Sequence, residues 1–268
     1  MPASLRRLLH AICLIACAGT VWGQGASNPP GFTVSPIIVV ADPTPAEFLD
    51  LLGKTAKARW RLLFRPPPPT PPTDRARSAL ILGTLIGESY LIWQSGDAQQ
   101  FRNTNQDIVS YCRTLGVGEK LMPRLMAQGK MAETEQWKEL AVEIAESHQQ
   151  LLAFLREMQD EDLALLIDTG LWLRILEVAS KLAVESPMPE ARPLCMGAPN
   201  TLQEMRDRIG KVSEKQRQTA LIQRVQTAIT EAQTAWQAAP KPAPEQDALL
   251  KMHQGIETLV QAVWEKEK

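Results

Sequence analysis

The stretch that decides the fold is SALILGTLIGESYLIWQSGDAQQFRNTNQDIVSYCRTL, residues 78–115. Its pattern predicts two helices separated by a break at Ser95 and Gly96, and the first helix is apolar almost all the way round. Because a helix that is apolar on every side must be buried, neighbouring helices have to surround it. Gly83 and Gly87 lie on one side of this helix, where they allow another backbone to approach closely. The stretch therefore predicts an all-α fold, a multi-helix bundle built around this helix.

Further helices that could surround the first one follow later in the chain. Residues 135–158 have the strongest amphipathic pattern, with apolar side chains recurring at intervals of three and four and Thr134 as the expected N-cap. Residues 171–184 are apolar on most sides, so we expect this segment and the first helix to form the inner pair of the bundle. Gly170 precedes the segment and predicts a helix break there.

Composition and charge narrow the class of protein and of partner. The chain has 268 residues, enough for one sizeable domain with extensions or for two small domains. Hydrophobic residues make up 44% and charged residues 22%, which argues against disorder throughout. The formal net charge is −1, so we expect neither nucleic acid nor an anionic membrane surface as a partner. The expected partner is another protein of the cell envelope, and the composition leaves the oligomeric state open.

The N-terminus has the pattern of an export signal. Arg6 and Arg7 precede an apolar run at residues 8–18 that is too short to remain as a membrane anchor. Gly23 then provides the small residue of a cleavage site. We therefore expect residues 1–23 to be a signal peptide and the mature chain to reach the periplasm or cell envelope.

The predicted export determines how the cysteines are interpreted. Residues 14–17, Leu-Ile-Ala-Cys, resemble a bacterial lipobox, and in that alternative Cys17 is lipidated and anchors the protein to the membrane. The mature chain keeps Cys112 and Cys195, which in an oxidising compartment form either a disulfide or two separate buried thiols. No cysteines have the spacing of metal ligands, and we expect no metal and no cofactor.

The distribution of proline divides the mature chain. Residues 65–73, RPPPPTPPT, have six prolines in seven positions, which excludes a helix and predicts an extended polyproline II segment. Such a run is either a rigid spacer, which we favour, or the ligand of an aromatic-lined groove. The expected parts are a Pro-rich extended arm with one short helix (24–73), a helical core domain (74–186), a Pro-rich linker (187–200) and C-terminal helices packed on the core (201–268).

Glu88, Ser89 and Tyr90 are the sharpest candidates for chemistry. An acid followed by Ser near the end of an apolar helix resembles the catalytic Glu-Ser of soluble lytic transglycosylases. The resemblance implies a helical, exported enzyme that cuts peptidoglycan with Glu88 as general acid. The family's downstream Gly-Leu-Met-Gln segment is absent, and residues 120–123, Lys-Leu-Met-Pro, only partly match it. The alternative is a buried glutamate that pairs with an arginine such as Arg102.

The remaining candidates point away from catalysis. His148 and His253 lie on or beside apolar helix faces, and we interpret both as structural, because no carboxylates recur at ligand spacing. The export signal, the stiff proline run and the long polar C-terminal helices predict a non-catalytic exported cell-envelope scaffold or binding protein of unknown ligand. The alternative function is a lytic-transglycosylase-like hydrolase, which requires Glu88 to line a cleft long enough for a glycan.

Overall fold

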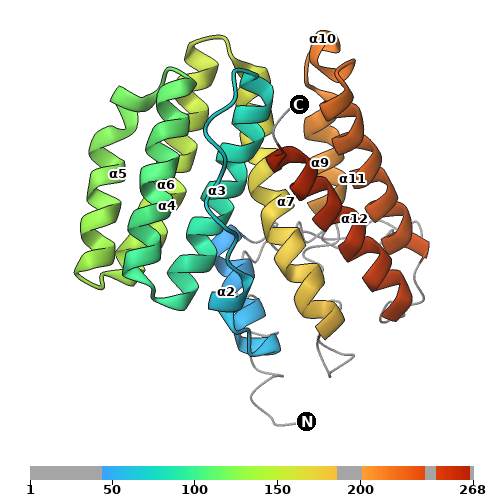
Figure 1. Cartoon of the computed structure of the whole chain (residues 1–268), viewed down its shortest axis with the longest axis horizontal. Coiled ribbons are helices and arrows are strands. Elements are labelled where there is room, and N and C mark those ends of the chain that lie inside the picture. Colours follow the sequence, from blue (N-terminus) through green and yellow to red (C-terminus); the bar gives the residue numbers. More distant parts are fainter. Residues whose placement is uncertain (1–43, 186–200, 239–245, 266–268) are drawn as a thin grey trace, which may run out of the picture. The chain divides into compact units, whose positions relative to one another are not determined.

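The computed structural model describes residues 44–185, 201–238 and 246–265, all within one compact unit that spans residues 41–268. The described ranges are helical and contain no strand, so the predicted all-α fold is confirmed (Figure 1). The elements are α2 Pro45–Ala56, the 3₁₀ turn η1 Trp60–Leu63, α3 Arg75–Ser95, α4 Ala98–Thr114, α5 Gly118–Glu133, α6 Trp137–Glu157, α7 Glu161–Glu185, α9 Thr201–Gly210, α10 Glu214–Arg217, α11 Ala220–Ala238 and α12 Gln246–Trp264.

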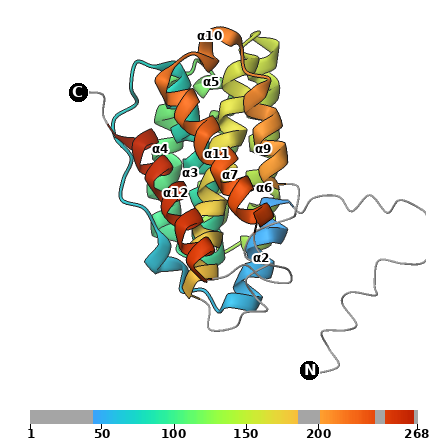
Figure 2. The same ribbon diagram turned by 90° about the vertical axis from the view of Figure 1, so that its right-hand side faces the viewer.

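Helices α3 and α7 form the inner pair, as the apolar patterns predict. On one side of the pair α4, α5 and α6 pack in sequence and close back onto α3 and α7. On the other side α12 and α9 contact α7, and α11 lies against both of them (Figures 1 and 2). Residues 78–92 of α3 are all buried, so this part of the helix, which has no polar face, is surrounded by other parts of the protein on every side.

Two glycines bring the inner helices into backbone contact. A Cβ atom added at Gly83 would lie 2.0 Å from the carbonyl oxygen of Ile167, and one added at Gly170 would lie 2.2 Å from that of Leu80. Both distances are far below any real contact, so only hydrogen fits at these positions. The predicted break at Gly170 is therefore wrong: α7 runs through it without interruption, and Gly170 serves close packing with α3.

Side-chain and backbone caps set the helix ends. Asp74 accepts hydrogen bonds from the backbone N–H groups of Ala76 and Arg77 at 2.8 and 3.2 Å and so caps the start of α3. Gly96 ends α3 with φ +65°, which confirms the predicted break. The prediction that Thr134 is the N-cap of α6 is wrong. Its N–H donates to the carbonyl of Lys130, so Thr134 is the C-cap of α5 instead.

Residues 64–73, which we call the strap, connect η1 to α3 and run along α3 in the opposite direction. The Tyr111 hydroxyl of α4 donates to the Pro69 carbonyl at 2.8 Å, and the Ser78 hydroxyl of α3 donates to the Pro72 carbonyl at 2.9 Å. These bonds satisfy carbonyls that a proline-rich segment cannot pair within itself. The strap is thus held against its own bundle, and the interpretation of this run as a spacer is wrong.

Several expectations lie outside the described residues. They concern the signal peptide at residues 1–23, the lipidation site Cys17, and Cys195 within the 187–200 segment. Among the residues that are described, no helix combines the length and the hydropathy needed to cross a bilayer.

Candidate functional site

Four charged side chains, Arg65, Glu88, Arg174 and Glu177, form a buried charge cluster where the strap meets the inner helices. Arg174 of α7 lies at its centre and is 3% exposed. Its Nε–H donates to Glu88 Oε2 at 2.7 Å and one Nη1–H donates to Glu177 Oε2 at 2.6 Å. The remaining Nη2 group donates to the Leu63 carbonyl at the end of η1. One guanidinium group therefore joins α3, α7 and η1.

Arg65, in the strap, completes this cluster. Its backbone N–H donates to Glu88 Oε1 at 2.9 Å, and its Nε–H donates to Glu177 Oε2 at 3.1 Å. The guanidinium carbon lies 5.2 Å from the centre of the Trp264 ring, a cation–π contact with α12. Two positive and two negative charges thus balance in a region largely closed to water, which is the condition under which buried charges are tolerated.

Local sequence explains how the cluster fits between tightly packed helices. Gly87 precedes Glu88, and a Cβ atom at Gly87 would lie 2.9 Å from the Cβ of Arg174. The missing side chain leaves room for the Arg174 stem beside the Glu88 carboxylate. Arg174 and Glu177 are three residues apart and so lie on one face of α7.

Electrostatic interactions within the cluster favour the charged forms of Arg174 and Glu177. Burial alone would raise the pKa of Glu177, but the charges and hydrogen bonds of Arg174 and Arg65 outweigh burial and hold the pKa below its usual value. Burial would likewise lower the pKa of Arg174, but the two paired carboxylates hold it above its usual value. Arg174 and Glu177 therefore stabilise the charged forms of each other.

The structure places Glu88 beneath the strap. Its carboxylate is 3% exposed, and both oxygens accept the hydrogen bonds described above. It contributes to the wall of a pocket of about 180 Å³, whose rim includes Pro66–Pro68 and Trp264. That volume is below the range of ordinary ligand pockets. The expected partner Arg102 instead pairs with Glu133 at 2.9 Å, so Arg174 is the arginine that holds Glu88.

Two further pockets lie against η1 and α7. The strap pocket, about 200 Å³, lies between the strap, α7 and α12 and includes Glu177, His253 and Gln261 in its wall. The η1 pocket, about 270 Å³, lies between the end of α2, η1 and the end of α7. Leu62, Leu63 and Lys181 line both, so the two pockets are adjacent.

His253 packs in the wall of the strap pocket. Its Nδ1 lies 3.0 Å from the Ser180 hydroxyl, which in turn lies 3.0 Å from the Glu177 carbonyl. Since the hydroxyl has one hydrogen and the carbonyl can only accept, we assign the proton between ring and hydroxyl to Nδ1. Burial lowers the pKa of His253, while Glu257 and Glu177 oppose the shift and Lys181 adds to it. Ser180 itself is fully buried and therefore out of reach of any substrate.

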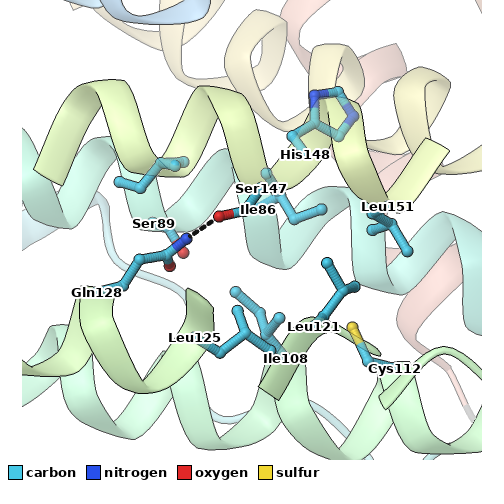
Figure 3. A pocket seen from close by; sticks show the side chains of 11 residues that line it. Ile86, Ser89, Ile108, Cys112, Leu121, Leu125, Gln128, Ser147, His148 and Leu151 are labelled. Atoms are coloured by element: carbon cyan, nitrogen blue, oxygen red, sulfur yellow. Dashed lines mark hydrogen bonds between the residues drawn. The ribbon is translucent and has the colours of Figure 1, made fainter. Parts of the chain in front are cut away.

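A small internal pocket lies between α3, α4, α5 and α6 (Figure 3). Its free volume of about 20 Å³ suits one water molecule rather than a ligand. Gln128 donates to the Ser147 hydroxyl at 2.6 Å on one side, and Ser89 donates to its own helix at the Leu85 carbonyl. Ser89 therefore shares no hydrogen bond with Glu88.

Cys112 lines the same internal pocket as a free thiol. Burial raises the pKa of this thiol to about 12, so at neutral pH it stays protonated and unreactive. Because Cys195 lies outside the described residues, the choice between a disulfide and two separate thiols is not tested.

His148 is buried at the junction of α6 with α7 and α9. Its Nε2 lies 3.7 Å from Asp168 Oδ1, too far for a hydrogen bond, and Asp168 Oδ2 pairs with Arg208 Nε at 3.0 Å. Burial lowers the pKa of His148; Asp168 opposes the shift, and Arg208 and Arg156 add to it. Across the described ranges no three His, Cys, Asp or Glu side chains gather as a metal site would require.

Comparisons of the chain with protein-family models, with curated proteins and with solved structures find no match. The charge cluster and the adjacent pockets are therefore the basis for assigning a function.

Proposed function

We propose that this protein is a non-catalytic, exported helical scaffold or binding protein of the cell envelope. The proposal rests on one observation, which is where the hydrogen bonds of the charge cluster go. The hydrogen bonds of Glu88, Arg174 and Arg65 go to one another, to Glu177 and to the end of η1, so these groups stabilise a rigid frame. Enzymes instead keep a charged group at the site within reach of substrate.

The proposed partner is another envelope protein, and a lipid on Cys17 is the alternative to plain cleavage of the signal peptide. Two observations support a binding role over catalysis: Ser180 is buried, and Glu88 lies under the strap. The transglycosylase alternative gains no support from this geometry, because a glycan would have to displace the strap to reach the carboxylate.

Export is tested by the mature N-terminus. The full chain with a C-terminal affinity tag is produced in a Gram-negative host, fractionated and measured by intact-mass spectrometry. We expect protein in the periplasm whose first residue is Gln24. The alternative is a chain that begins at an acylated Cys17, and in that case the variant Cys17→Ala would lose the acyl group. A chain that keeps Met1 and stays in the cytoplasm would contradict export.

The absence of catalysis is tested on purified peptidoglycan, with a lysozyme as positive control. We expect the wild-type chain and Glu88→Gln to release no soluble fragments. Release by the wild type that Glu88→Gln abolishes would replace the proposal by the hydrolase alternative.

Binding is tested by reciprocal capture. Envelope proteins cross-linked to the tagged chain are identified, and each is then tagged in turn and must retrieve this chain. A partner found in both directions supports the proposal, and purified components that do not associate would contradict it.

A further inference from the structure

The η1 pocket combines an apolar floor with an excess of positive charge. Leu63 and Leu182 form the floor, and both are buried. Lys57, Arg59 and Lys181 stand around it. Within the described part of the chain, the side chains of these three cations form no hydrogen bond or ion pair. A pocket with these two properties is suited to a molecule that has an apolar part and an anionic part.

The charges around the η1 pocket favour an anionic ligand. The pocket has three cations and a single carboxylate, Glu185. The C-terminal ends of α2 and α7 also lie here, and each contributes about half a negative charge. About one positive charge therefore remains without compensation, which one anionic head group would balance.

The wall of the pocket offers an accessible apolar contact. Leu62 lines the pocket and is 65% exposed, so its side chain is available to the apolar part of a ligand. Lys57 ends α2 as its C-cap, with φ +49°, and this left-handed turn leads the chain into the pocket wall.

We propose that the η1 pocket binds a soluble, single-chain amphiphile with one anionic head group. The volume of about 270 Å³ corresponds to roughly nine water molecules of liquid, enough for a medium-length acyl chain and too little for a lipid with two chains. The acyl chain lies over Leu62, Leu63 and Leu182, and the head group contacts Lys181 and Arg59. The proposal goes beyond the scaffold function and does not depend on a protein partner.

The test is calorimetric titration of the full mature chain with three small molecules. Decanoate below its micelle concentration carries both chain and charge, decyltrimethylammonium carries the same chain with the opposite charge, and acetate carries only the head group. We expect saturable one-to-one binding of decanoate alone. Equal binding of the cationic amphiphile, or no saturable binding of decanoate, would overturn the proposal.

Variants locate the site. Lys181→Met keeps the length of the side chain and removes its charge, so decanoate affinity should fall about tenfold, as expected for the loss of one charged hydrogen bond. Leu62→Gln should weaken binding as well, and Lys130→Met on the distant helix α5 is the matched control that should not. Thermal melts confirm that each variant is folded. If Lys181→Met binds as the wild type does, the site is elsewhere and the proposal fails.

A further experiment with lipid vesicles distinguishes binding of a free amphiphile from binding to a membrane surface. Sedimentation with vesicles of phosphatidylglycerol should carry down no more protein than vesicles of phosphatidylcholine do. Association with the anionic vesicles without binding of monomeric decanoate would overturn the proposal in favour of a membrane contact.

Discussion

Arg174 on α7 donates to the carboxylate of Glu88 on α3 at 2.7 Å, and both side chains are 3% exposed. The bond joins the two innermost helices one turn beyond the point where Gly83 and Gly170 bring their backbones together. Arg174 also holds Glu177 and the end of η1. Arg65 of the strap binds Glu177 in turn and lies over the Trp264 ring, so two guanidinium groups together link the strap, the inner pair and α12.

Arg174→Met tests this link. The substitution removes the charge and keeps an apolar stem, and it leaves Glu88 and Glu177 buried without their main partner. Breaking a buried pair in this way costs about 3–5 kcal/mol, so the free energy of unfolding should fall by that amount. Urea denaturation followed by tryptophan fluorescence measures the change.

The control for that experiment is Glu88→Gln, which keeps an acceptor for Arg174 and leaves the Arg174–Glu177 pair intact. Its loss of stability should be clearly smaller. A loss below about 1 kcal/mol for Arg174→Met would mean that water enters the cluster and replaces the ion pairs.

The sequence predicts the inner pair well, because a segment without a polar face can only be buried. It predicts the role of Gly170 wrongly. A lone glycine in a helical pattern usually indicates a break, and the reason for this one is the backbone of α3, ninety residues earlier in the chain. Close approach between helices is a tertiary property, and the local pattern does not encode the partner.

The sequence predicts only part of the charge cluster. It points to Glu88, but it suggests a partner on the next helix, at Arg102. A stronger signal was present in the second apolar segment, where Arg174 and Glu177 interrupt an otherwise apolar face. Charges in two helices that must both be buried have to pair with one another. The strap, in contrast, could not be placed, because its hydrogen bonds go to side chains far along the chain.

Gly83→Ala tests the backbone contact between the inner helices. The new methyl group would lie 2.0 Å from the Ile167 carbonyl, so α3 and α7 must separate. We expect the free energy of unfolding to fall by about 2–3 kcal/mol, the upper range for overpacking in a core.

Gly255→Ala on α12 is the matched control, because nothing lies within 4 Å of the added atom. A helical glycine in open space costs stability relative to alanine, so this variant should gain about 0.5–1 kcal/mol. Equal effects of the two substitutions in chemical denaturation would show that helix propensity alone, and not close packing, explains Gly83.

Cys112 should be inert in the folded protein. In a Cys195→Ser version of the mature chain, Cys112 is the remaining thiol, and burial raises its pKa to about 12. A thiol reagent such as DTNB should therefore react with it only after urea unfolds the chain. Rapid labelling of the native protein would show that the α4 face opens to solvent. Without the Cys195→Ser substitution, the absence of thiols after unfolding would favour the disulfide over the alternative of two separate thiols.

His148 predicts how stability depends on pH. Burial holds the pKa of His148 below its ordinary value of 6.5, Arg208 and Arg156 add to this shift, and Asp168 only partly offsets it. As the pH falls below about 6.5, the unfolded chain binds a proton that the folded chain does not accept. Stability is therefore full above pH 6.5 and is lost as the pH falls from there toward the folded-state pKa, by at most about 1.4 kcal/mol per pH unit for one histidine.

The measurement is a series of urea denaturation curves between about pH 5.5 and 7.5, a range above the titration of ordinary carboxylates. His148→Gln should reduce the slope of stability against pH, and the slope is compared because the substitution changes absolute stability as well. His253 also has a lowered pKa, so His148→Gln keeps part of the slope and the double variant with His253→Gln should lose nearly all of it. An unchanged slope in His148→Gln would mean that His148 is protonated equally in both states, and that the gap of 3.7 Å to Asp168 closes into an ion pair in solution.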